Sequence, residues 1–158
     1  MKIERKFLAH FINAANAGED ANYERLGKDL EEYSVSLSAQ VESKKNILGQ
    51  TSVLISSYEK TAAVEPYYAE VGSALFDRLQ AIIDEAQVLD ALKTDVVEVK
   101  LWGVQEGTVY PAVKEEAFIE VTSYGGDISG YQIPFTVHYT GNKVIGTFDV
   151  DTKEFVAV

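Results

Sequence analysis

Cysteine is absent from this chain of 158 residues, and histidine occurs only at His10 and His138. Without cysteine there is no disulfide framework, no thiolate chemistry and no cysteine-based metal site. Neither histidine has a second ligand residue at metal-binding spacing, and a strand histidine such as His138 is typically a hydrogen-bonded surface side chain. These absences leave little basis for metal binding or catalysis.

Basic residues are scarce as well: Lys and Arg total 14, Asp and Glu total 25, and the formal net charge is −11. This acidic excess argues against a surface that grips nucleic acid, because phosphate contacts need clustered lysine and arginine. It also argues against adhesion to anionic membranes. An acidic surface can still face DNA usefully where its task is to repel it.

The sequence also lacks the motifs that organise catalytic and cofactor sites. The glycine-rich stretch at 125–130 has no Lys-Ser/Thr end and does not open a helix, so it is not a phosphate loop. The acidic stretch at 149–154 lacks the sixth-position glycine of a calcium loop. There is no G-x-S-x-G or H-E-x-x-H motif. We therefore expect a protein that is not an enzyme and has no cofactor.

No apolar run approaches the ~18 residues that a membrane helix needs. Residues 1–17 superficially resemble a secretory signal, with a basic start, an apolar segment and a small-residue end. His10 and Asn13 interrupt that apolar segment, and Glu4 interrupts the basic start. We therefore expect a protein that is made in the cytoplasm and is not inserted in a membrane.

The length and the apolar content of 46% suit one folded domain over residues 1–158. One segment, 73–92, has the periodicity of an amphipathic helix, with Ser73 as its N-cap. Alternation of period two predicts strands at 29–42, 51–59, 95–102, 115–123, 131–139 and 143–150. We expect the last two to be joined by a tight turn at Gly141-Asn142. The pattern predicts a mainly β (α+β) domain: an antiparallel sandwich or barrel of about six to eight strands with one flanking helix.

The most regular strand pattern has an apolar row and a polar row. The apolar row is Tyr33, Val35, Leu37, Ala39 and Val41, and the polar row is Ser34, Ser36, Ser38, Gln40 and Glu42. Such alternation predicts one buried side and one solvent-facing side. The solvent-facing side is mostly serine and has few of the long charged side chains that usually cover an exposed sheet.

The segment at 42–51 is expected to be the loop of a long hairpin, with Ile47 and Leu48 at its tip. This apolar pair either folds back against its own domain or contacts a partner. Two aromatic residues, Tyr67 and Tyr68, likewise fit either an interface anchor or a core plug beneath the helix.

The succession of segments at 28–53, 57–84, 96–102 and 119–142 resembles phage major tail proteins, the tail tube subunits of prophages and tailocin-like particles from Gram-positive bacteria. The resemblance covers residues 5–155 and rests on the order and the amino-acid sequences of these segments. It implies a β-sandwich-like subunit with a flanking helix, six subunits per ring with their sheets joined into one barrel, and rings stacked into a tube. Family tubes commonly have an acidic lumen, along which DNA or a tape-measure protein slides.

The resemblance implies roles for two sets of residues. The loop at 42–51 matches the family's hairpin loop that reaches towards the neighbouring ring, so inter-ring contacts are expected at Lys44, Lys45, Ile47 and Leu48. The polar row from Ser34 to Glu42 suits a smooth lumen wall, and an ordinary solvent-facing sheet is the alternative. The implied partners are further copies of the chain, tape-measure, tail terminator and baseplate proteins, and, in a contractile tail, a sheath. DNA passes without specific binding, and the implied location is the virion tail.

A different class of function also fits the strand pattern. A small β-sandwich module could bind a carbohydrate or peptide through exposed aromatic residues such as Trp102, Tyr110 and Tyr124. Self-association separates the two classes, because a binding module stays small at any concentration whereas a tube subunit forms rings or filaments.

Overall fold

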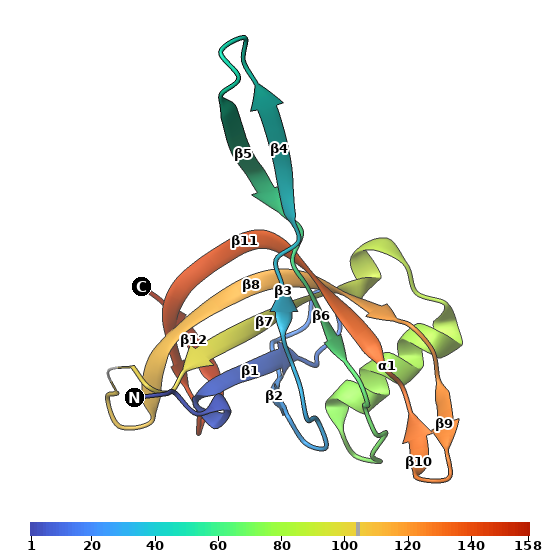
Figure 1. Ribbon diagram of the computed structural model, residues 1–158. Helices are drawn as coiled ribbons and strands as arrows, with labels where there is room; N and C mark the ends of the chain where they lie inside the picture. The colour runs from blue at the N-terminus through green and yellow to red at the C-terminus, as the bar shows by residue number, and fades with distance from the viewer. Residues whose placement is uncertain (104) are drawn as a thin grey trace.

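The computed structural model describes residues 1–103 and 105–158 (Figure 1). The fold is mainly β with one α-helix, which confirms the predicted fold class. In chain order the elements are η1 (Arg5–Phe7), β1 (Leu8–Asn13), β2 (Tyr23–Leu26), β3 (Val35–Ser36), β4 (Ala39–Lys45), β5 (Thr51–Tyr58), β6 (Thr61–Val64), α1 (Ala74–Glu85), η2 (Leu89–Leu92), β7 (Lys93–Lys100), β8 (Val109–Val121), β9 (Gly125–Asp127), β10 (Gly130–Gln132), β11 (Phe135–Asp149) and β12 (Glu154–Ala157).

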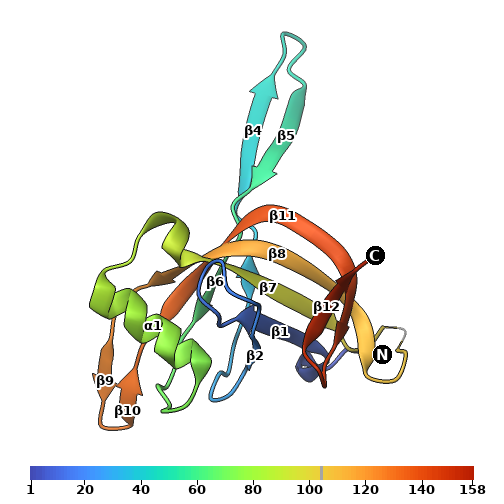
Figure 2. The same ribbon diagram turned by 180° about the vertical axis from the view of Figure 1, so that it is seen from behind.

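Eight strands form one curled sheet, a half-barrel, in the order β2-β1-β7-β8-β11-β6-β3 (Figures 1 and 2). The eighth strand, β12, pairs with the C-terminal end of β11. Two further pairs, β4–β5 and β9–β10, form separate two-stranded sheets. The strand pairings in the described chain are antiparallel, as expected for a domain with one helix.

Both faces of the main sheet carry a hydrophobic core. Successive residues of a strand point to opposite faces, so Phe11 and Ile12 of β1 enter different cores, as do Val97 and Val96 of β7. Ile12 and Val96 pack with Leu79 of α1, and we call this side the helix face. Phe11 and Val97 pack on the opposite side, which we call the back face.

The helix is shorter than the segment 73–92 that its periodicity predicted. Ser73 is the N-cap, as predicted, and its side-chain oxygen accepts a hydrogen bond from a backbone N–H of the first turn. The helix ends at Glu85 because Ala86 adopts the left-handed conformation, with φ 48°. Leu89, which lies within the segment predicted to be helical, is exposed in the short helix η2.

The expected hairpin turn at Gly141-Asn142 is wrong. Strand β11 continues through both residues and pairs with β8 on either side of them. Gly141, with φ 89°, lies in a bulge between Tyr139 and Lys143. Glycine between two alternating runs is typical of bulges as well as hairpin turns. The chain turns instead at 150–153 into β12, a strand that the sequence pattern did not predict.

The strand predicted around the serine row is not continuous. Ser38 adopts a left-handed conformation, with φ 38°, between β3 in the main sheet and β4 in a separate sheet. The predicted buried side is therefore wrong from Leu37 onwards, for three of its five residues. Tyr33 is buried and Val35 is partly buried, whereas Leu37 and Val41 are exposed. Alternation identifies a two-sided strand but does not say whether the body of the protein covers one side.

Gly146 marks a close approach between β11 and β12. A Cβ atom at this position would lie 2.2 Å from the backbone oxygen of Val156 and 2.7 Å from Cζ of Phe155. Since one of these contacts is backbone, the added methyl group displaces the strand rather than a flexible side chain.

We expect Gly146→Ala to lower the free energy of unfolding by about 1–3 kcal/mol, the usual cost of overpacking. Urea denaturation of the wild-type protein and the variant measures this change in the free energy of unfolding. The matched control is Thr147→Ala on the same strand, which adds no atom and should change stability by no more than about 0.5 kcal/mol. Equal effects of the two substitutions would show that the close approach is not a constraint.

Candidate functional site: a projecting ribbon

Strands β4 and β5 form an antiparallel ribbon that projects away from the body of the protein (Figures 1 and 2). Every residue of the two strands is exposed. Their register joins Ala39 to Tyr58 at the base and Lys45 to Thr51 near the tip. This pairing confirms the predicted long hairpin, although its loop is confined to 46–50 rather than 42–51.

Asn46 organises the tip of the ribbon. Its side-chain oxygen accepts hydrogen bonds from the backbone N–H groups of Leu48 and Gln50, at 2.9 Å and 3.0 Å. The backbone N–H of Asn46 donates to the carbonyl of Gln50, and Gly49 supplies a positive φ of 78° in the turn. Ile47 and Leu48 are exposed on this turn, so the apolar pair does not fold back against its own domain.

The two sides of the ribbon differ chemically. Cross-strand partners project their side chains to the same side of a strand pair, so the register assigns each residue to a face. One side, the apolar face, carries Ala39, Val41, Val53, Ile55 and Tyr58, and towards the tip it also carries Ser43, Lys45 and Thr51. The other side, the polar face, carries Gln40, Glu42, Lys44, Ser52, Leu54 and Ser57.

The apolar face is the feature that points to a function. Its four large side chains, Val41, Val53, Ile55 and Tyr58, are between 51% and 63% exposed. Full burial of such side chains is worth about 1.5–3 kcal/mol each, and an isolated two-stranded ribbon is marginally stable at best in water. A contiguous exposed apolar patch of this kind marks a site of interaction with another macromolecule.

A buried ion pair anchors the base of the ribbon. Lys60 lies between β5 and β6, and its Nζ is 2.6 Å from Oε1 of Glu115 in β8. The Lys60 side chain is 17% exposed and the Glu115 side chain is 6% exposed. The other Glu115 oxygen accepts a hydrogen bond of 3.0 Å from the backbone N–H of Gly141 in the β11 bulge. The Lys60 ammonium also lies 5.0 Å from the ring centroid of Tyr139. The ribbon is therefore tied to the centre of the main sheet.

Further polar groups adjoin this ion pair. The hydroxyl groups of Tyr33 and Tyr139 are hydrogen-bonded at 2.8 Å, and burial raises the pKa of Tyr33 to about 12. The Tyr33 ring packs on buried His10, and His10 Nε2 lies 3.6 Å from a Glu98 oxygen. The neighbouring His10 side chain lowers the pKa of Glu98. We call the group that crosses the helix face the polar seam: His10, Glu98, Glu115, Lys60 and Tyr139.

The residues predicted to line a lumen do not form one continuous row. Ser34 and Ser36 lie on the body side of the hinge at Ser38, whereas Gln40 and Glu42 lie on the polar face of the ribbon. The hinge interrupts the alternation, although the hydroxyl groups of Ser36 and Ser38 remain 3.2 Å apart.

The residues predicted to contact a neighbouring ring are brought together at the tip. Lys44 and Lys45 end β4 on the polar and apolar sides of the ribbon respectively, next to Ile47 and Leu48. The apolar face itself was missed, because its alternation has the same appearance as that of a strand packed on its own core. The signal that could have found it is Val53 and Ile55, which repeat the alternation on the paired strand.

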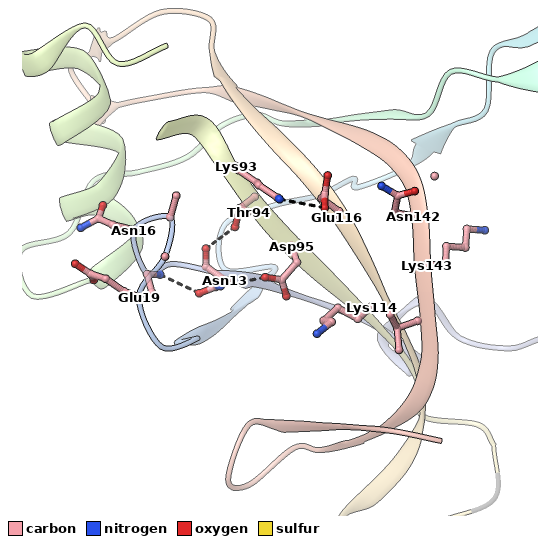
Figure 3. Close-up of a pocket in the computed structure, with 15 residues that line it drawn as sticks. Asn13, Asn16, Glu19, Lys93, Thr94, Asp95, Lys114, Glu116, Asn142 and Lys143 are labelled. Carbon is pink, nitrogen blue, oxygen red and sulfur yellow. Dashed lines mark hydrogen bonds and ion pairs between the residues drawn. The ribbon is translucent and has the colours of Figure 1, made fainter. Parts of the chain in front are cut away.

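A hollow of about 650 Å³ lies between the loop after β1 and the bulge of β11 (Figure 3). Two pairs of its polar side chains interact: Lys93 lies 3.4 Å from Glu116, and Asn13 donates a hydrogen bond of 3.0 Å to Asp95. Among the described residues, no group of three His, Cys, Asp or Glu side chains could hold a metal ion. We therefore assign no chemistry to this hollow.

The aromatic residues considered for ligand binding do not form one platform. Trp102 and Tyr124 are exposed, but Tyr110 packs in the back-face core. Tyr110 is the second residue of β8 and Tyr124 lies beyond its end, so most of this strand of 13 residues separates them. Tyr67 packs in the helix-face core with its ring centroid 5.8 Å from that of Phe135, which confirms the core-plug alternative for this residue.

No protein-family model matches this chain, and a search of curated proteins gave no match. Among the described residues, no helix has the length and apolar character needed to cross a membrane. We therefore infer a function from the ribbon and from the resemblance of the sequence segments.

Proposed function

We propose that the protein is a structural subunit that self-assembles into stacked hexameric rings and forms the tail tube of a phage or phage-tail-like particle. The tube is a conduit for DNA or for a tape-measure protein. The main support for self-assembly is the apolar face of the ribbon, which is exposed in the single chain. The hexameric ring and the tube follow from the resemblance to phage major tail proteins.

The open edges of the sheets support the same proposal. Strands β2 and β3 stand at the two ends of the main sheet, and β12 pairs with β11 on one side only. Unpaired strand edges are templates for pairing with another chain. A closed ring of identical copies pairs such edges without leaving an end, because each copy meets the next through the same contact.

The net charge of the chain and the polar face of the ribbon support the proposed role as a conduit. A net charge of −11 opposes adsorption of DNA, since like charges repel along the wall of a channel. With the apolar face covered by protein, the polar face is left to solvent. Gln40 and Glu42 on this face are our candidates for the lumen wall, together with Ser52 and Ser57 from the paired strand.

This proposal places the protein in the virion tail after synthesis in the host cytoplasm. Its principal partner is a further copy of itself. The other implied partners are tape-measure, tail terminator and baseplate proteins and, in a contractile tail, a sheath.

We expect the purified protein to increase in mass with concentration and to form six-fold rings or hollow tubes. Sedimentation velocity from micromolar to millimolar concentration measures the mass, and negative-stain electron microscopy of the most concentrated samples shows the form. A protein that remains monomeric over this whole range would contradict self-assembly and favour the small binding module. Filaments without six-fold rings would retain self-assembly and contradict the hexameric ring.

A further inference from the structure

Beyond the polar seam, the sheet carries a second exposed apolar surface on β8, β11 and β12. We call it the outer patch, and it consists of the exposed side chains of Ile145, Val156 and Val158 and the partly buried side chains of Pro111 and Val113. Ile145 lies opposite Val113, and the backbone N–H of Val158 donates to the carbonyl of Ile145. Thr147 lies opposite both Pro111 and Val156, so the register places the five side chains on one side of the sheet.

The outer patch lies on the helix face. Val113 lies opposite Glu98 of β7, and Glu98 is two residues beyond Val96, which belongs to the helix-face core. Helix α1 packs on this face against Val96 of β7 and against Ala117 and Ile119 of β8. In contrast, Ile145, Val156 and Val158 are between 62% and 97% exposed. The same face of the sheet is thus covered on one side of the polar seam and exposed on the other.

The ribbon of the same chain does not cover the outer patch. Its base is held by the ion pair between Lys60 and Glu115, and the ribbon extends away from the main sheet (Figures 1 and 2). The molecule therefore presents two separate apolar sheet surfaces, one on the ribbon and one on the body.

We infer that the apolar face of the ribbon of one copy packs on the outer patch of the next copy. Face-to-face packing at about 10 Å is the usual way in which two apolar sheet faces are buried. The apolar face contributes five apolar side chains from a ribbon that spans Ala39–Tyr58, so this contact is one part of a standard interface of about 20–30 residues a side. This inference rests on the proposed function, because it names the surface through which the subunits join.

The two surfaces are different parts of the chain, so the contact is heterologous. Each copy uses its ribbon on one neighbour and its outer patch on the other. Such a contact repeats until the rotation closes a ring, or continues as a filament if it does not close. A symmetric dimer, in which the same patch meets itself, is not expected.

A mixing experiment tests the heterologous contact. The ribbon variant carries Val53→Ser and Ile55→Ser, and the patch variant carries Ile145→Ser and Val156→Ser; all four side chains are exposed, so both variants should fold. Circular dichroism and thermal unfolding check this. We expect each variant alone to remain monomeric where the wild-type protein assembles, with self-association weakened at least tenfold. An equimolar mixture retains one intact ribbon and one intact patch, so it should form a 1:1 dimer and nothing larger.

Cross-linking gives a second measurement, because the natural chain has no cysteine. A mixture of the single variants Val53→Cys and Ile145→Cys should give a dimer with a short bis-maleimide reagent. The matched control is Ser52→Cys, which places the thiol on the polar face next to Val53, and it should give at least tenfold less dimer with Ile145→Cys. Cross-linking within single chains of the double variant Val53→Cys/Ile145→Cys would show that the ribbon covers its own patch and would overturn the inference.

The results separate this inference from the proposed function. A wild-type protein that stays monomeric at every concentration contradicts both. A patch variant that assembles as the wild type does, or a mixture that stays monomeric beside an assembling wild type, overturns only the pairing of ribbon and outer patch.

Discussion

Replacing Val53 by serine should weaken self-association of the protein at least about tenfold, whereas replacing the adjacent Leu54 should have little effect. The two side chains are 63% and 59% exposed, so both substitutions remove a similar exposed apolar surface. They lie on opposite sides of the ribbon, with Val53 on the apolar face and Leu54 on the polar face. Burial of one such side chain is worth about 1.5–3 kcal/mol, and about 1.4 kcal/mol corresponds to a factor of ten in an association constant.

Sedimentation over a concentration series measures this difference. Because both residues are exposed on the ribbon, each substitution should change the free energy of unfolding by no more than about 0.5 kcal/mol. Adding Ile55→Ser to Val53→Ser should extend the loss of association to about a hundredfold if the two contributions add. Equal losses for Val53→Ser and Leu54→Ser would contradict a one-sided contact and indicate a general effect of apolar area.

The second large effect is expected at the base of the ribbon. Lys60→Met removes one partner of a buried ion pair and leaves the Glu115 carboxylate, 6% exposed, without its counter-charge. Breaking such a pair from one side typically costs about 3–5 kcal/mol. We expect a loss of this order in the free energy of unfolding, measured by urea denaturation at neutral pH.

The exposed pair between Lys28 and Glu70 is the matched control, since its side chains are 74% and 49% exposed. Lys28→Met should lower the free energy of unfolding far less than Lys60→Met does, because water screens the charges and solvates the remaining carboxylate. The double variant Lys60→Met/Glu115→Leu should recover much of the stability, since no unpaired charge then remains buried. If Lys60→Met is no more harmful than Lys28→Met, the ion pair does not anchor the ribbon.

Local sequence patterns determined much of the body of the protein. The alternation at 95–102 and 115–123 corresponds to β7 and to the central and C-terminal parts of β8, because these strands lie in the middle of the sheet and pack on a core. Ser73 began the helix as predicted, since capping depends on the residue and on the adjacent turn. The same local logic predicted the long hairpin, whose two strands are close in sequence.

The candidate site depended on tertiary structure. Val41, Val53 and Ile55 alternate with polar residues as core strands do, and only the left-handed Ser38 hinge places them outside the body. The seam joins Lys60 to Glu115, which are 55 residues apart in the chain. The sequence by itself determined the mainly β composition, the hairpin and the acidic charge. The strands and the hairpin depend on residues that are neighbours in the chain, and the net charge is a sum over all residues. The three-dimensional arrangement alone decided which apolar faces remain uncovered, because coverage depends on which distant segments pack together.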